Sequence, residues 1–219
     1  MNTTLIMNST LKKLGQFGVV PVVVLDDAKD AAPLAKALCE GGLACAEVTV
    51  RTEAAAESIR IMTETCPEMV VGAGTVLTTK QVDSAIAAGA KFIVTPGLDP
   101  EIVAYGIERG IPVTPGVVSP SELAQAYKLG LRLVKFFPAE PSGGLPMIKA
   151  LAAPYNMMQF MPTGGISAAT LPDYLSYDKI FACGGSWMVK SDLIKSGDFE
   201  RITALTKEAV ELVHSIREV

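Results

Sequence analysis

The feature that most constrains the fold of this chain is a regular alternation between short apolar runs and longer helix-like segments. Eight apolar runs occur at intervals of roughly 20 to 26 residues. They span Val19–Leu25, Ala44–Val50, Met69–Ala73, Phe92–Thr95, Ile111–Thr114, Arg132–Phe137, Gln159–Thr163 and Ile180–Cys183. Runs this short and this apolar are typical of strands buried on both faces, as in a parallel sheet that helices cover.

Segments with helical periodicity fill the intervals between the apolar runs. They span Asp30–Glu40, Glu53–Thr65, Thr79–Ala88, Pro100–Arg109, Pro120–Leu129, Leu145–Ala152 and Ala168–Leu175, and a final one covers Asp198–Arg217. Strict alternation of strands and helices implies right-handed parallel crossovers. Eight such units predict a closed (β/α)8 barrel, the TIM barrel, which commonly takes about 200–250 residues.

An additional helix is expected over residues 2–14, ahead of the first strand. Its Leu5, Ile6, Leu11 and Leu14 would cover the underside of the barrel. Neither a linker nor a change of composition divides the 219 residues, so we expect a single domain over residues 1–219.

Composition and charge argue against several classes of protein. The chain is 49% apolar with a mean hydropathy of +0.36, yet no run approaches the roughly 18 consecutive apolar residues of a membrane-spanning helix. The net charge is −4 and no basic cluster is present, which argues against nucleic acid or an anionic membrane as a partner. The first residues, MNTTLIMNSTLKK, do not follow the order of a secretory leader, so we expect a cytoplasmic location.

Metal chemistry is also disfavoured. The four cysteines show no CxxC spacing, and the single histidine, His214, lies in the last helical segment, far from the candidate site. A zinc hydrolase or zinc-dependent aldolase would normally need more imidazole than this. We therefore expect no metal and no other cofactor, and we interpret the cysteines as reduced packing residues.

The stretch LRLVKFFPAE, residues 131–140, places a lysine inside an otherwise apolar strand. Burial disfavours the charged ammonium, and a lysine kept partly neutral is suited to forming a Schiff base with a ketone. The alternative is that Lys135 extends from the strand end into water. Lys91 and Lys179 stand at strand starts, whereas Lys135 lies near the carboxyl end of its strand, where barrel active sites form.

The second apolar run ends in AEVTVRT, and alternation along a strand puts Glu47, Thr49 and Arg51 on one face. If that face lines the barrel, Glu47 is deep and Arg51 is nearer the rim. Strands two and six lie opposite each other in an eight-strand ring, so Glu47 can face Lys135. A buried carboxylate there can shuttle protons, and the alternative is a structural ion pair between Glu47 and Arg51.

Glycine and threonine occur at the ends of the other strands. GAGT at residues 72–75, TPG at 95–97 and TPG at 114–116 offer close backbone approach and hydroxyl groups to a ligand. PTGGIS at 162–167 and ACGGS at 182–186 place Gly-Gly after strands seven and eight, each leading into a helix start. Phosphosugar barrels bind phosphate at this position, through backbone N–H groups and a helix dipole.

These motifs together resemble the class I 2-keto-3-deoxy-6-phosphogluconate (KDPG) aldolases, which also act on 4-hydroxy-2-oxoglutarate (KHG). The resemblance rests on EVTVRT, VGAGTV, TPG, TPGV, VKFFPAE, PTGGIS and GGSWM in that order, over nearly the whole chain. It implies a metal-independent enzyme that reversibly cleaves KDPG to pyruvate and glyceraldehyde 3-phosphate, and KHG to pyruvate and glyoxylate. It also implies a homotrimer, with keto acids and phosphosugars as the small-molecule partners.

The resemblance further implies a role for each matched site residue. Lys135 would form the Schiff base and Glu47 would shuttle protons. The substrate-binding residues would be Arg51 and Thr75 at the pyruvate carboxylate, Pro96 and Phe137 on the apolar wall, and Thr163, Gly164, Gly165, Gly184 and Ser186 at the phosphate end.

Two other functions stay open from the residues. A phosphosugar isomerase would share the Gly-Gly phosphate site but would need an acid–base pair at the rim and no desolvated lysine. A non-catalytic binder of phosphorylated metabolites would be expected to lack Lys135 or Glu47, and this chain has both. Preference between KDPG and KHG is not encoded in the motifs, because the two substrates share the pyruvate half.

Overall fold

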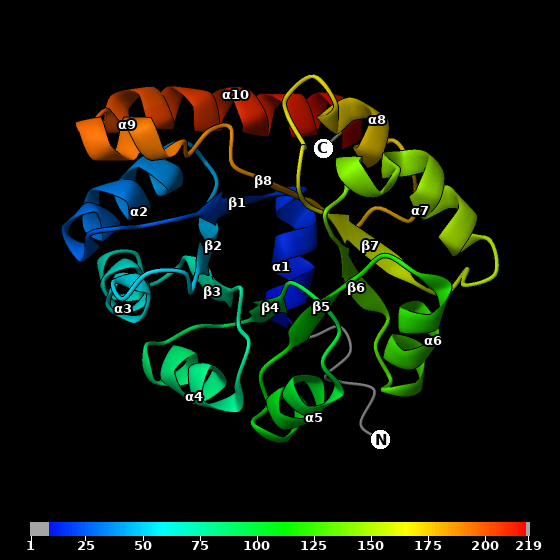
Figure 1. Cartoon of the computed structure of the whole chain (residues 1–219). Coiled ribbons are helices and arrows are strands. Elements are labelled where there is room, and N and C mark those ends of the chain that lie inside the picture. The colour runs from blue at the N-terminus through cyan, green and yellow to red at the C-terminus, as the bar shows by residue number, and fades with distance from the viewer. Residues whose placement is uncertain (1–8, 218–219) are drawn as a thin grey trace.

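A computed structural model describes residues 9–217 of the chain as a ring of parallel strands surrounded by helices (Figure 1). The strands are β1 (Val19–Val23), β2 (Cys45–Thr49), β3 (Val70–Gly74), β4 (Ile93–Thr95), β5 (Val113–Val117), β6 (Leu133–Phe136), β7 (Gln159–Pro162) and β8 (Cys183–Gly185). They form one eight-stranded sheet in the order β7-β6-β5-β4-β3-β2-β1-β8. The (β/α)8 barrel predicted from the alternation is confirmed.

The ring closes between β7 and β8, the two ends of that strand order. Two isolated parallel bridges, Phe160 with Ile180 and Thr163 with Gly184, join these strands. The backbone N–H of Phe181 donates to the carbonyl of Phe160 at 2.9 Å. The contact between β7 and β8 is therefore bridged near both ends of the two strands. Because the ring is closed there, the carboxyl ends of all the strands surround one common mouth.

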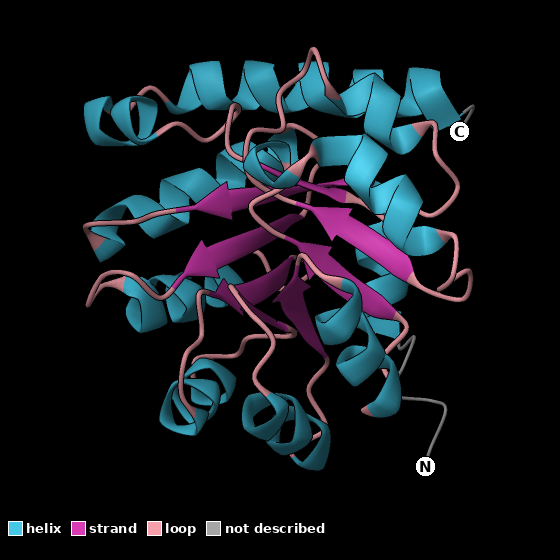
Figure 2. Ribbon diagram, turned by 45° about the vertical axis from the view of Figure 1, so that its right-hand side comes forward, coloured by secondary structure: helices cyan, strands magenta, loops and turns pink. Residues whose placement is uncertain are grey.

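The helices form a layer outside the strands (Figure 2). They are α2 (Ala31–Glu40), α3 (Ala55–Thr65), α4 (Thr79–Ala87), α5 (Pro100–Glu108), α6 (Pro120–Lys128), α7 (Gly144–Ala152), α8 (Leu171–Leu175), α9 (Ser191–Ser196) and α10 (Phe199–Arg217), with 3₁₀ turns η2 (Ala28–Asp30) and η3 (Glu140–Ser142). The short helix α9 was not predicted from the sequence. In residues 9–217, no helix is long and apolar enough to cross a membrane.

The amino-terminal helix α1 (Ser9–Phe17) lies at the amino-terminal end of the ring. It buries Leu11 and Leu14 and contacts β1 and β3. The predicted cover over the underside is thus present, but the helix runs three residues further than expected, to Phe17. Leu5 and Ile6, which were expected to share this role, lie outside the described residues.

Strands β5 and β8 run further than predicted, because Gly and Pro were interpreted as strand ends. Strand β5 continues through Pro115 and Gly116, and Gly116 pairs with Lys135 of β6. Strand β8 begins at Cys183 and contains Gly184 and Gly185, which were expected to follow it. Only glycine fits at both sites of close approach: an ideal Cβ at Gly116 would lie 2.1 Å from the Pro96 carbonyl oxygen, and one at Gly184 2.3 Å from Thr163 Oγ1.

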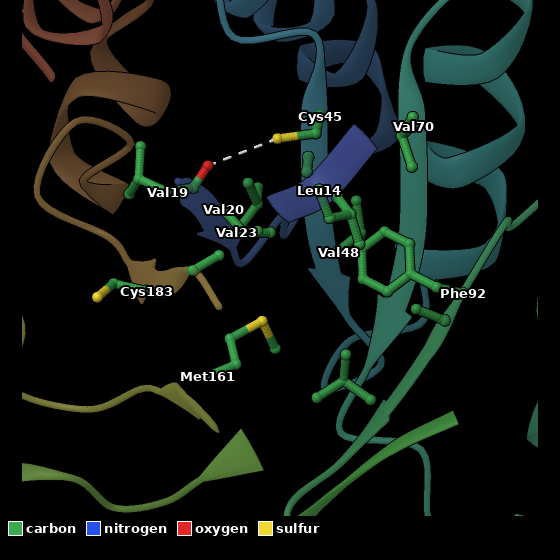
Figure 3. Close-up of a cluster of buried hydrophobic side chains, with 14 of the residues drawn as sticks. Leu14, Val19, Val20, Val23, Cys45, Val48, Val70, Phe92, Met161 and Cys183 are labelled. Carbon is green, nitrogen blue, oxygen red and sulfur yellow. Dashed lines mark hydrogen bonds between the residues drawn. The ribbon is translucent and has the colours of Figure 1, made fainter. Parts of the chain in front are cut away.

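The core is apolar inside the ring and between the ring and the helices (Figure 3). Phe92 is 1% exposed and packs flat against Gly72, where an ideal Cβ would lie 2.4 Å from its ring. Cys45 points toward β1, and its thiol lies 3.7 Å from the Val19 carbonyl oxygen. Large aromatic side chains fill the interior of the barrel where small residues such as glycine leave space. The barrel is therefore a packed core below its mouth.

Helix α6 begins with a capping box formed by Ser119 and Glu122. The hydroxyl of Ser119 accepts from the Glu122 N–H at 3.3 Å, and the Glu122 carboxylate accepts from the Ser119 N–H at 2.9 Å. Backbone groups at a helix start have no partner within the helix, so such caps stabilise it.

We predict that Ser119→Ala lowers the free energy of unfolding by about 1 kcal/mol, because the Glu122 N–H loses its acceptor. Urea unfolding followed by circular dichroism measures this change. Ser215→Ala is the matched control, since the Ser215 hydroxyl bonds only the Leu212 carbonyl of its own helix on the surface. Equal stability of the Ser119 variant and the wild type would contradict the capping role.

Candidate active site

Lys135 and Glu47 meet inside the mouth of the barrel, as their places on β6 and β2 predicted. Lys135 Nζ lies 3.3 Å from Glu47 Oε1. Lys135 is 4% exposed and Glu47 is 0% exposed. The interpretation of Lys135 as a side chain that extends into water is therefore wrong. The ion pair also joins Glu47 to Lys135 and not to Arg51, so the predicted alternative of a structural Glu47–Arg51 bridge is wrong too.

Space for the Glu47 carboxylate comes from Gly74 on the neighbouring strand β3. An ideal Cβ at Gly74 would lie 2.2 Å from Glu47 Oε1. The GAGT motif was interpreted as an approach of the backbone to a ligand, but at Gly74 the missing side chain makes room for a catalytic candidate. Strand alternation puts residues 72 and 74 on the same face as Glu47, which is the signal that could have predicted this contact.

Arg51 and Thr75 stand together at the rim. Arg51 follows β2 and is exposed, and its Nε donates to Thr75 Oγ1 at 3.2 Å. Thr75 follows β3 with a φ of +57°, in the left-handed region that side chains other than glycine seldom adopt. Backbone strain of this kind is concentrated at functional sites. The hydrogen bond engages Nε, and the terminal nitrogens of a guanidinium suit a bidentate grip on a carboxylate.

Phe137 and Pro96, the two residues expected to form an apolar wall, follow different strands of the barrel, β6 and β4. Lys135 Nζ lies 4.7 Å from the centroid of the Phe137 ring, so the ring borders the amine directly. Pro96 follows β4, is partly buried, and has its carbonyl against Gly116 of β5. The structure therefore brings Phe137 into contact with the amine and places Pro96 two strands away from it.

The loop after β7 is joined to the loop after β6. The N–H of Thr163 donates to the Phe136 carbonyl at 3.0 Å, and the N–H of Ala139 donates to the Thr163 carbonyl at 2.8 Å. Gly164 and Gly165 follow with φ values of +100° and +86°. Consecutive residues with positive φ turn backbone N–H groups out of the strand direction, which suits them to binding an anion.

The predicted helix dipole is not part of this arrangement. Helix α8 begins at Leu171, and α9 begins at Ser191, so neither Gly-Gly pair leads directly into a helix. Gly184 bridges Thr163 across the barrel seam. Ser186 is exposed and lines a hollow of about 340 Å³ whose lining residues do not include Lys135 or Glu47. Anion binding at these loops would therefore depend on backbone groups and not on helix ends.

Two buried oxygen atoms at this site have no hydrogen-bond partner within residues 9–217: Glu47 Oε2 and Thr163 Oγ1. Thr163 is 6% exposed and lies at the end of β7. Buried polar atoms are nearly always paired in folded proteins, so these two oxygen atoms are free to take a hydrogen bond from a bound molecule. Both atoms belong to residues that the sequence had assigned to the site.

One group of residues within the described chain has the donor atoms to hold a metal ion. It consists of Cys39, Cys66 and Glu68, whose ligand atoms all lie within 4.8 Å of one another. Cys39 lies in the last turn of α2, and Cys66 and Glu68 follow the end of α3, on the opposite end of the barrel from Lys135. Burial, together with Cys66 and Glu68, raises the pKa of Cys39 to about 12, so the thiol is protonated at neutral pH. The cluster is not part of the Lys135 site.

An amine, a carboxylate and an aromatic ring thus meet in a buried space at the barrel mouth, with a guanidinium at the rim. A lysine amine can attack a carbonyl carbon once it is unprotonated, and a carboxylate at hydrogen-bond distance can accept and return its proton. The arrangement suits covalent carbonyl chemistry on a small anionic substrate.

Comparison with known proteins gives a family for the chain. Residues 9–205 match the family model described as KDPG and KHG aldolase. A 2-dehydro-3-deoxy-phosphogluconate aldolase from Haemophilus influenzae is 47% identical over 203 residues, which cover 93% of this chain and 96% of that protein.

Two solved structures are similar to the whole barrel. A Zymomonas mobilis 2-keto-3-deoxy-6-phosphogluconate aldolase with 3-phosphoglycerate has a TM-score of 0.87 and 41% identity, over 94% of this chain and 96% of that one. A Legionella pneumophila KDPG aldolase, with pyruvate captured at low pH as a covalent carbinolamine, has a TM-score of 0.89 and 38% identity, over 92% and 98%.

We predict that Lys135→Met lowers the free energy of unfolding by about 3–5 kcal/mol, because it leaves the Glu47 carboxylate buried and unpaired. The double variant Lys135→Met/Glu47→Leu should recover much of that loss, since both charged groups are then gone. Urea unfolding of the two single variants and the double variant gives the coupling free energy. Additive effects would show that the two side chains do not act as a buried pair.

Proposed function

The chain belongs to the KDPG and KHG aldolase family, and from this premise we propose that Lys135 is its Schiff-base nucleophile and Glu47 its proton carrier. The enzyme is a class I lyase that reversibly cleaves KDPG to pyruvate and glyceraldehyde 3-phosphate, and KHG to pyruvate and glyoxylate. The single observation that carries the residue assignment is a buried lysine 3.3 Å from a buried carboxylate at the barrel mouth. The phosphosugar isomerase and the non-catalytic binder receive no support from the family.

The first half of the reaction makes the covalent intermediate. The unprotonated Nζ of Lys135 attacks the C2 carbonyl carbon of the substrate, and the carbonyl oxygen gains a proton to give a carbinolamine. Loss of water then gives an iminium ion. This cation accepts the electron pair of the C3–C4 bond when that bond breaks, so that the electrons are held as an enamine.

Glu47 carries the protons in these steps. Its Oε1 is at hydrogen-bond distance from Lys135 Nζ, and its Oε2 has no partner within the described residues. The first oxygen can accept the proton of the amine, and the second can accept the proton of the C4 hydroxyl as the aldehyde forms. Return of a proton to C3 of the enamine, followed by addition of water to the iminium carbon, releases pyruvate and restores the amine.

Arg51 and Thr75 bind the carboxylate of the pyruvate half in this proposal. The Arg51 side chain is fixed through Nε by Thr75, which supports a defined orientation of the guanidinium. A planar guanidinium binds a carboxylate through two parallel hydrogen bonds.

The loop of Thr163, Gly164 and Gly165 binds the phosphate end, with Gly184 and Ser186 at the neighbouring strand. The backbone conformation of the two glycines and the unpaired Thr163 hydroxyl support this assignment. Phe137 and Pro96 form the apolar wall beside the carbon chain. No cofactor is required for any step, because the lysine itself supplies the electron sink.

We also propose a homotrimer in a cytoplasmic location. The family resemblance supports the trimer, and exposed apolar side chains such as Leu77, which is 56% exposed, offer surface for association. Four cysteines within the described chain are free thiols, which is typical of a reducing compartment.

We predict that Lys135→Met abolishes release of pyruvate from KDPG, because a thioether side chain cannot form the imine. A coupled assay that follows pyruvate measures this loss in protein whose circular dichroism is that of a folded barrel. Lys91→Met is the control, since Lys91 lies exposed at the opposite end of the barrel. If the Lys135 variant released pyruvate at the wild-type rate, the nucleophile would have to be another residue.

We predict that Glu47→Gln lowers kcat by about 10²–10⁴-fold, the usual contribution of a positioned general acid–base group. The amide keeps the shape of the side chain but carries no exchangeable acid proton. Steady-state kinetics across pH measures kcat and its pH dependence. An unchanged kcat and an unchanged pH profile in this variant would show that Glu47 is only an ion-pair partner of Lys135 and not a proton carrier.

A further inference from the structure

A second carboxylate, Glu140, stands behind the glycine loop at the phosphate end. Its backbone N–H donates to the Gly164 carbonyl at 3.0 Å, which continues the pairing of the two loops. Its side chain lies along Gly165, where an ideal Cβ would be 2.5 Å from Glu140 Cγ. Glu140 therefore contacts both glycines of the loop, one through its backbone and one through its side chain.

The carboxylate of Glu140 is held by Tyr174 of helix α8. The Tyr174 hydroxyl donates a short hydrogen bond to Glu140 Oε1. Tyr174 is 2% exposed, so the helix fixes the position of its hydroxyl. Burial and the hydrogen bond to Glu140 raise the pKa of Tyr174 above its usual range, so the hydroxyl stays a donor at every pH at which the enzyme works.

The loop needs such a support, since glycine restricts its own backbone least of all residues. Gly164 and Gly165 both have positive φ values. On the other side of Glu140 and Tyr174 lies Gly144, where an ideal Cβ would be 3.0 Å from the Tyr174 hydroxyl and 3.2 Å from Glu140 Oε1. Gly144 therefore leaves just enough space for the Glu140–Tyr174 hydrogen bond. The hydrogen-bonded pair thus lies between the glycine loop and the start of α7, although Glu140 as a whole is an exposed residue. Held in this place by Tyr174, the Glu140 side chain restricts the movement of Gly165 toward it.

Charge adds a second requirement at this place. A carboxylate close to a bound phosphate repels it, and the repulsion grows as the two groups approach. The hydrogen bond from Tyr174 directs Glu140 Oε1 toward α8. It therefore fixes the loop and keeps the negative charge of Glu140 toward the helix at the same time.

We propose that Glu140 and Tyr174 form a positioning pair that holds the Gly164–Gly165 loop in the conformation that binds a phosphoryl group. The pair makes phosphorylated KDPG a better substrate than KHG, which has no phosphate. This inference rests on the proposed function of the Lys135 site, because it concerns the far end of the same substrate. Neither residue contacts the reacting carbons, and both act through the loop.

The test compares Tyr174→Phe with the wild type on both substrates. We predict that the KM for KDPG rises about five- to tenfold, the factor that corresponds to the net contribution of one ordinary hydrogen bond, with kcat nearly unchanged. The kinetic constants for KHG should stay within about twofold of wild type, since that substrate does not use the loop. Glu140→Ala removes both the acceptor of the Tyr174 hydroxyl and the side chain that lies along Gly165, so its KM for KDPG should also rise.

Tyr177→Phe is the matched control: its ring also lies near the end of α8, against Lys149, and its KM for KDPG should not change. Equal losses on KDPG and KHG, or no loss on either, would overturn the proposed pair. Trapping of pyruvate by borohydride separates this inference from the proposed function. Failure of wild-type enzyme to form the Lys135 adduct would overturn the nucleophile assignment, whereas a normal adduct with an unchanged KM in Tyr174→Phe would overturn the pair alone.

Discussion

The Lys135–Glu47 pair sets the requirements that the rest of the barrel mouth meets. Two ionisable side chains are placed in a buried space, and neither position is favourable without the other. Gly74 is small because the carboxylate needs its space, and β6 lies opposite β2 because the amine has to reach that carboxylate. The packed core below the mouth keeps the two side chains together in the buried space.

The two ends of the substrate are handled by different physical means. In the proposed complex, side chains hold the carboxylate at the pyruvate end, where the Arg51 guanidinium is fixed by Thr75, a residue with a strained backbone. At the proposed phosphate end, backbone N–H groups of a glycine loop would bind the anion, and the side chains of Glu140 and Tyr174 stand behind the loop. A side chain orients a planar carboxylate, whereas a turn of backbone suits a group with three equivalent oxygen atoms.

Much of this arrangement could be predicted from the sequence, because its strongest signals are local and periodic. The barrel was predicted from the eight apolar runs. The position of Glu47 opposite Lys135 was predicted from the alternation of side chains along the strands. What could not be predicted depends on contacts between distant residues. Strand β8 extends through Gly184 because Thr163 lies against it, and α8 begins only at Leu171, which removes the expected helix dipole. Glu140 and Tyr174 are 34 residues apart, and no local pattern joins them.

The central claim, that Lys135 is the nucleophile of this aldolase, is tested most directly by covalent trapping. The protein is incubated with pyruvate and sodium borohydride, its intact mass is measured, and the modified peptide is mapped by tandem mass spectrometry. The account predicts one pyruvate-derived adduct per chain, reduced to a stable secondary amine on Lys135. A folded protein without an adduct, or with its adduct on another lysine such as Lys91, would contradict it.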